Sequence, residues 1–149
     1  MTGPDSIVMD ESELDEFLGD GGTGVIAFST TGEDPPHAIP VSYGYDATEG
    51  TFYFRLAVGP DSRKGDVDGR AVSFVIHGSP NGAWQSVVAE GRLERTTDES
   101  IANETLQGLD RVRIPLFDVF DRPTGDVPFE FYRLVPEELT GRKESNRGP

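Results

Sequence analysis

The chain has 149 residues, and its 27 Asp and Glu against 13 Lys and Arg give a net charge of −14 at pH 7. A field of that sign repels nucleic acid and anionic membrane surfaces, so neither is expected as a partner. The absence of cysteine excludes disulfides, thiolate metal sites and cysteine nucleophiles. With no apolar run near the ~18 residues of a membrane helix and no secretory signal pattern, we expect a cytoplasmic protein.

The acidic composition also predicts a response to salt. Lysine occurs only at Lys64 and Lys143, and every other basic residue is arginine. An acidic, lysine-poor chain without cysteine resembles proteins of salt-loving organisms, in which molar salt shortens the Debye length to about 3 Å and screens repulsion. We therefore expect a halophilic protein. The alternative is an ordinary acidic cytosolic protein, whose melting temperature would not depend on salt.

The first predicted element is a short helix. Asp10 can cap its N-terminus, and Glu13 follows at the spacing of a capping box. The glycines of residues 19–24 are predicted to end the helix, and Val25 to Thr30 is predicted to form a buried strand. The apolar side chains of the helix share one face: Leu14, Phe17 and Leu18.

A predicted hairpin follows, over residues 38–58. Its first strand alternates, with Val41 and Tyr43 on the apolar face, and Pro40 places it at an edge or a bulge. Its second strand puts Phe52, Phe54 and Leu56 toward the core and turns Thr51, Tyr53 and Arg55 away from it. A face that carries tyrosine and arginine indicates a ligand or a subunit contact.

The remaining elements complete a mostly β protein. Strands are predicted over residues 71–77, 84–96 and 129–135, and Asp98 can cap a helix that ends near Val112. Residues 111–126 are expected to be largely irregular, and the end of the chain to be a turn and a solvated tail. Hairpin spacing with few helices favours an antiparallel barrel with a short N-terminal helix and one or two further helices. We expect one domain over residues 1–149, with flexible ends at 1–9 and 143–149.

Several segments, taken in order, carry a family resemblance. They read ELDEFL, GVIAFST, HAIPVSYGYD, TFYFRLAVGPDSRK, WQSVVAEGRLE and FYRLVPEELTGR. Together they resemble the FMN-binding split β-barrel proteins related to pyridoxamine 5′-phosphate oxidase, over roughly residues 13–142. That resemblance implies a homodimer with two FMN sites at its interface.

The resemblance also implies which residues contact the flavin. Residues 39–43 would follow the isoalloxazine ring and ribityl chain, partly through backbone groups, and residues 53–55 would form the next contact. Residues 62–64 would grip the phosphate, and residues 84–86 would reach the flavin from the partner subunit. The implied set is Ile39, Pro40, Val41, Ser42, Tyr43, Tyr53, Phe54, Arg55, Ser62, Arg63, Lys64, Trp84, Gln85 and Ser86.

The chemistry of residues 62–64 supports a phosphate site independently of the family resemblance. A guanidinium can hold a phosphate bidentately, a lysine adds a point charge, and Ser62 supplies a hydroxyl donor. The alternative is that Arg63 and Lys64 only form surface ion pairs with nearby acids such as Asp61 and Asp66.

Departures from the family pattern bear on the substrate. Tyr43 stands where the vitamin B6 oxidases carry a lysine, and their C-terminal Arg-x-His motif is missing, so B6 oxidation is not expected. We expect an FMN-dependent oxidoreductase acting on a small molecule, with NAD(P)H as a candidate electron donor. The alternatives are a deazaflavin-dependent reductase on the same barrel, or a flavin- or haem-binding protein without turnover. His37 lies beside the predicted flavin strand and could contact the ligand, but a loop histidine without a role is the simpler interpretation, and His77 suits a structural role. No metal site is expected, and no catalytic residue is identified.

Overall fold

The computed structural model describes residues 6–30, 32–57, 69–96 and 129–144. They form one α-helix, a short 3-10 turn at Pro80–Gly82 and eight strands. The elements in chain order are β1 (Ser6–Val8), α1 (Glu11–Leu18), β2 (Gly21–Phe28), β3 (His37–Asp46), β4 (Thr51–Ala57), β5 (Ala71–Gly78), β6 (Gln85–Arg95), β7 (Phe129–Leu134) and β8 (Glu138–Glu144).

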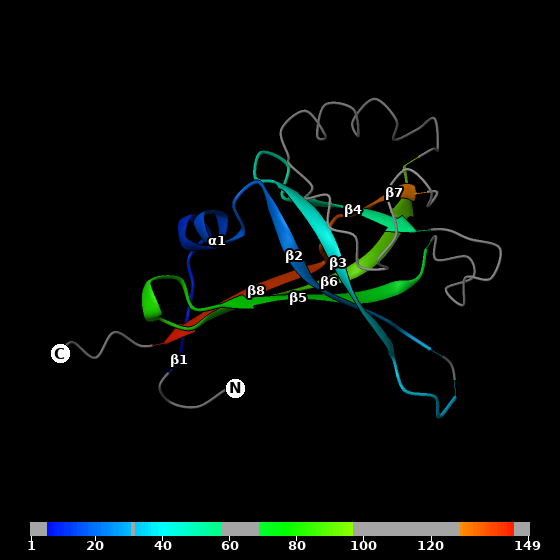
Figure 1. Ribbon diagram of the computed structural model, residues 1–149, viewed down its shortest axis with the longest axis horizontal. Helices are drawn as coiled ribbons and strands as arrows, with labels where there is room; N and C mark the ends of the chain where they lie inside the picture. Colours follow the sequence, from blue (N-terminus) through cyan, green and yellow to red (C-terminus); the bar gives the residue numbers. More distant parts are fainter. Residues whose placement is uncertain (1–5, 31, 58–68, 97–128, 145–149) are drawn as a thin grey trace.

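The strands form an antiparallel barrel, as predicted. Six of them follow one another in the order β6-β5-β2-β3-β4-β7, and β7 pairs back onto β6 to close the ring. Strand β8 pairs with the first part of β6, and β1 pairs with β8, so these two extend the sheet beyond the ring (Figure 1). Closure leaves the ring strands paired on both sides over much of their length and so removes exposed edges.

The core lies inside the barrel and is rich in aromatic rings. The alternating positions predicted to face inward are buried on β3 and β4, which confirms the predicted faces of the hairpin, and alternate residues of β5 and β6 are buried in the same core. Phe74 is at the centre of the ring contacts, with its centroid 4.7 Å from that of Phe54, 5.3 Å from Tyr43 and 5.5 Å from Phe52. These pairs meet edge to face, the arrangement that the ring quadrupole favours.

Helix α1 is attached to the barrel by its apolar face and by tyrosine hydroxyls. The predicted capping box is present: the Asp10 side chain accepts from the Glu13 N–H, and the Glu13 side chain accepts from the Asp10 N–H. Leu18 is buried in the core, and the Tyr43 hydroxyl donates to the Leu18 carbonyl at 2.9 Å. The helix therefore begins and ends where the sequence predicted.

The strand after the helix begins earlier than predicted. Only Gly19 lies at the helix end, with φ of +60°, whereas β2 already starts at Gly21. Gly22 pairs with Tyr43, and Gly24 pairs with Val41 on β3. A Cβ atom built on Gly24 would lie 2.7 Å from the Val75 carbonyl oxygen, so glycine is needed here because neighbouring strands approach closely.

The C-terminal segment differs from the predicted solvated tail. Residues 138–144 form β8, which pairs with β6 from Gln85 to Glu90, and residues 6–8 add β1 along its other side. Leu139 packs against the core, and Gly141 makes room for Leu14 and Met9. The first half of β6 would otherwise have a free edge, and this pairing satisfies its backbone groups.

Some expectations fall outside the described residues. The predicted helix beginning at Asp98 and the irregular stretch of residues 111–126 both belong to this group, as do Ser62, Arg63 and Lys64. Within the described part of the chain, no helix is long and apolar enough to span a membrane. No group of three or more His, Asp or Glu side chains in that same part is placed to hold a metal ion.

Candidate functional site

The predicted tyrosine–arginine face lies on the outside of the barrel wall formed by β3, β4 and β7. Phe52, Phe54 and Leu56 of β4 enter the core, so the alternate residues Tyr53 and Arg55 face outward. In the strand register, Tyr53 lies between Gly44 of β3 and Arg133 of β7, and Arg55 lies beside Phe131 of β7. Strand β7 thus adds an arginine and a phenylalanine to the predicted face.

Much of this outer face is buried, although it is not part of the barrel core. Tyr53 is 2% exposed and Arg133 is 9% exposed. Ser42, Asp46 and Thr51 are buried on the same side of β3 and β4. Polar groups are costly to bury unless they are hydrogen-bonded. Asp46 meets this requirement in part, because one carboxylate oxygen accepts from the Thr48 N–H at 3.0 Å.

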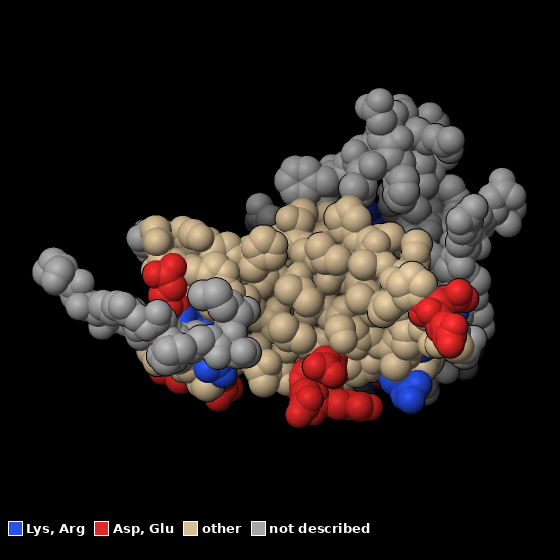
Figure 2. Space-filling view, turned by 90° about the horizontal axis from the view of Figure 1, so that it is seen from below, with Lys and Arg blue, Asp and Glu red and all other residues tan. Residues whose placement is uncertain are grey.

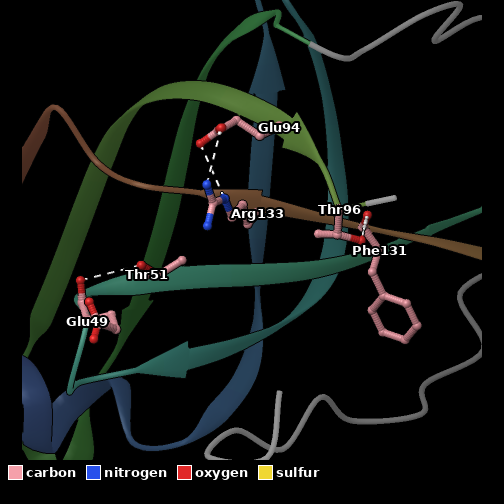
Figure 3. A network of polar contacts seen from close by, with 6 residues as sticks. All are labelled: Glu49, Thr51, Glu94, Thr96, Phe131 and Arg133. Atoms are coloured by element: carbon pink, nitrogen blue, oxygen red, sulfur yellow. Dashed lines mark hydrogen bonds and ion pairs between the residues drawn. The ribbon is translucent and has the colours of Figure 1, made fainter. Parts of the chain in front are cut away.

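An ion pair and a threonine tie β7 to β6 at this face. The Arg133 guanidinium reaches Glu94 on β6, with 3.4 Å between Nε and Oε1 (Figure 3). The Thr96 hydroxyl donates to the Phe131 carbonyl at 2.8 Å, and the Thr96 N–H donates to the same oxygen at 3.3 Å. These contacts hold the backbone of β7 beside β6, while its pairing with β4 places Phe131 next to Arg55.

Three cationic side chains were predicted to lie in the flavin site, and of these Arg55 belongs to the described residues. Its side chain is half-buried, and burial lowers the pKa of its guanidinium. An arginine nevertheless stays charged at neutral pH. A partly desolvated cation attracts an anion more strongly than one in bulk water, because the local dielectric is lower. The position therefore suits a phosphate or a carboxylate.

The predicted residues of β3 and β4 divide between the two sides of the wall. Val41, Tyr43 and Phe54 point into the core, so only their backbone groups could face a ligand outside. Ser42 is buried on the outer side with Tyr53. Ile39 packs against the edge of the core, and Pro40 is exposed where β3 has only β2 as a neighbour among the described strands, as its predicted edge position requires.

The predicted residues of β6 lie far from this face in the same chain. Trp84, Gln85 and Ser86 are half-buried at the start of the strand, where Gln85 pairs with Gly78 and Lys143. Glu94 is nine residues further along β6, about 30 Å for an extended strand. One chain therefore does not bring Trp84, Gln85 and Ser86 together with Tyr53 and Arg55.

Sequence reasoning missed three residues of this face: Glu94, Phe131 and Arg133. The alternation of residues 129–134 was visible, because Tyr132 and Leu134 are the buried members of the strand. Phe131 and Arg133 could therefore have been assigned to the outer side. That this side lies next to Tyr53 and Arg55 follows only from the pairing of β7 with β4.

A closed antiparallel barrel with a short capping helix defines the chain as a split β-barrel protein. A sequence model of the family described as pyridoxamine 5′-phosphate oxidase matches residues 10–143, and the chain belongs to this family. None of the curated proteins compared with the chain matches it.

Solved structures of the same fold come from several bacteria. A Corynebacterium glutamicum protein provisionally named pyridoxamine 5′-phosphate oxidase aligns at a TM-score of 0.68 and 20% identity, covering 97% of both chains. An FAD-binding protein of Mycobacterium smegmatis aligns at 0.65 and 16%, covering 92% of this chain and 97% of that one. An FAD- and haem-binding protein of the same organism aligns at 0.60 and 14%, covering 97% and 75%. At these identities the likeness establishes the fold.

Proposed function

We propose that the protein binds a flavin nucleotide against the outer face of β3 and β4. The ligand is FMN or a larger nucleotide that contains FMN. The observation that carries the proposal is the outward pair of Tyr53 and half-buried Arg55, an aromatic ring and a cation on one strand of a strongly acidic protein. Membership of the pyridoxamine 5′-phosphate oxidase family supports it. So do the names of two proteins of this fold that bind FAD.

The residues fit an anionic, planar ligand. Arg55 can hold a phosphate bidentately, and in our proposal Ser62, Arg63 and Lys64 complete that phosphate site. The backbone of residues 39–43 would line the ring and the ribityl chain, with the Ser42 side chain on the same outer face. Trp84, Gln85 and Ser86 would come from a second copy of the chain, since they lie too far along β6 to act in the same copy.

We further propose that the protein is a flavin-dependent oxidoreductase for a small molecule, with NAD(P)H as electron donor. The flavin supplies the hydride and electron chemistry when bound. The residues of the chain bind it, orient its ring and shield one side from water. Oxidation of pyridoxamine phosphate is not proposed, because Tyr43, at the position of the lysine of those enzymes, points into the core and donates to Leu18.

A homodimer is part of the same proposal, and an uncharged outer surface supports it. A row across the barrel wall joins Pro40, Val25, Val75 and Val88 in register, and Val25 is 39% exposed. Figure 2 shows a broad uncharged face with acidic side chains grouped toward its margins.

Light scattering should give twice the chain mass, and Val25→Glu should shift the protein toward monomer and weaken flavin binding. A monomeric wild type contradicts the dimer.

Titration of the purified protein with FMN tests flavin binding directly. We expect a yellow complex with quenched flavin fluorescence, and at least tenfold weaker binding for Arg55→Ala, because a hydrogen bond to a charged group contributes about 1.5–3 kcal/mol. Arg63→Ala with Lys64→Ala should weaken binding similarly. Arg92→Ala, at an exposed arginine of β6, is the control and should bind as the wild type does.

One result would reject the flavin site itself, and another would reject only the phosphate-binding residues assigned to it. A colourless protein that takes up no FMN would exclude the flavin site. A haem band or deazaflavin fluorescence in the same preparation would then select the haem-binding or the deazaflavin alternative. Unchanged FMN affinity in Arg55→Ala and in the Arg63, Lys64 double variant would remove the phosphate role of those residues.

A further inference from the structure

We infer that Phe131 provides a stacking surface for the adenine of a dinucleotide flavin, so that the site favours FAD over FMN. The inference rests on the proposed flavin site and adds a strand that the sequence did not assign to it. FMN ends at the phosphate, whereas FAD continues through a second phosphate and a ribose to adenine. What lies next to the phosphate-binding arginine therefore decides between the two forms.

The register places Phe131 next to that arginine. Arg55 and Phe131 are directly paired across β4 and β7, and both face outward from the barrel. Side chains paired in this way have Cβ atoms about 4.5–5.5 Å apart. A phosphate held by the Arg55 guanidinium would thus lie beside the Phe131 ring, and the portion of FAD beyond that phosphate could extend over it.

The ring of Phe131 is accessible. Phe131 is 37% exposed, while Tyr53 and Arg133 on the same face are buried. Among the large apolar side chains exposed in the described residues, Phe131 is the aromatic one; the others are Ile7, Val8, Val25 and Val135. Isolated exposed apolar side chains are common on protein surfaces. This one differs because it is paired with a half-buried cation on a face that already contains Tyr53.

The backbone that carries the ring is also held firmly. The Phe131 carbonyl accepts two hydrogen bonds from Thr96, and Arg133, two residues further on, is paired with Glu94. Figure 3 shows the ring pointing away from Thr96, while the Arg133 guanidinium turns toward Glu94 on β6. Because this backbone is already ordered, its ordering adds no further entropy cost when a base stacks on the ring, which favours binding.

Parallel titrations with FMN and FAD test the inference. We expect the wild type to bind FAD about tenfold more tightly than FMN, within the range of base–aromatic stacking. Phe131→Leu should abolish this preference while leaving FMN affinity within about twofold, and Phe131→Tyr should keep it. Val135→Ala, at another exposed apolar residue one position beyond β7, is the control and should keep the wild-type ratio.

The ratio of affinities separates this inference from the flavin proposal. If the wild type binds FMN as tightly as FAD or more tightly, flavin binding stands and the role of Phe131 is wrong. The role of Phe131 is equally excluded if Phe131→Leu retains the FAD preference. If Phe131→Leu does not fold, as measured by circular dichroism, Phe131→Ile replaces it, since a β-branched residue suits a strand. Absence of binding to either nucleotide would overturn both proposals.

Discussion

At the scale of single residues, Tyr43 shows how one side chain can link two elements. It was a candidate for the flavin site, and its backbone keeps that role in our proposal. Its ring packs against Phe74, and its hydroxyl donates to the carbonyl of Leu18 at the end of α1. The same side chain therefore contributes to the core and holds the helix against the barrel.

Removal of this hydroxyl should destabilise the protein without changing its core. We expect Tyr43→Phe to lower the free energy of unfolding by roughly 1–3 kcal/mol, because the Leu18 carbonyl would remain buried without its donor. Urea unfolding followed by fluorescence measures this loss. Thr23→Ala, at an exposed position of β2, is the matched control and should change the stability little. An unchanged Tyr43→Phe midpoint would show that water replaces the lost donor.

The buried tyrosines also predict an alkaline limit to stability. Burial is the main cause that raises the pKa of Tyr43 and of Tyr45 from 10.0 to about 12, and nearby Asp20 and Asp15 add to it. The folded state thus keeps protons that the unfolded chain has already lost. The contribution of these two tyrosines to stability should be constant below pH 10 and fall between about pH 10 and 12. Unfolding midpoints across this range should fall less in a Tyr43→Phe, Tyr45→Phe variant.

At the scale of elements, the start of β2 shows two different physical reasons for a glycine. Gly19 ends a helix with a positive φ, while Gly22 and Gly24 lie in a strand that neighbouring side chains crowd. A Cβ on Gly22 would lie 3.2 Å from the Tyr43 ring, and one on Gly24 would lie 2.8 Å from the Phe74 ring. The first requirement is local and readable from sequence, whereas the second depends on what packs across the barrel.

Alanine at Gly24 should therefore be costly. We expect Gly24→Ala to lower stability by about 1–3 kcal/mol, because the added methyl group would overlap the backbone of Val75 and the ring of Phe74. Thermal unfolding by circular dichroism measures the loss, again with Thr23→Ala as reference. A Gly24→Ala protein as stable as this reference would mean that β2 and β5 separate at little cost.

At the scale of the whole molecule, the net charge of −14 should make stability depend on salt. The acids repel one another at low ionic strength, and molar salt screens them. We expect the melting temperature to rise substantially from dilute buffer to molar KCl. Comparison of KCl with a neutral osmolyte separates screening from general stabilisation. A melting temperature that does not change with KCl would contradict the halophilic expectation.

Much of the fold could be predicted from the sequence, since its signals are local. Asp10 and Glu13 lie within one helical turn, and the alternation at Phe52, Phe54 and Leu56 follows from the period of a strand. Order along the chain was enough to predict an antiparallel barrel and its family. The phosphate role of Ser62, Arg63 and Lys64 stays a prediction, because these residues lie outside the described ones.

What the sequence by itself determined was the location of β2 to β7 along the chain and, for β3 and β4, which side chains share a face. Tertiary structure alone decided which faces meet. The pairing of β7 with β4 places Phe131 beside Arg55. The pairing of β8 with β6 makes residues 138–144 a strand, where the sequence predicted a solvated tail. The physical reason is that strands pair through backbone N–H and C=O groups, which are the same for nearly every residue type and so do not specify the partner strand. Their partners follow from closure of the whole barrel, to which residues distant in the chain contribute together.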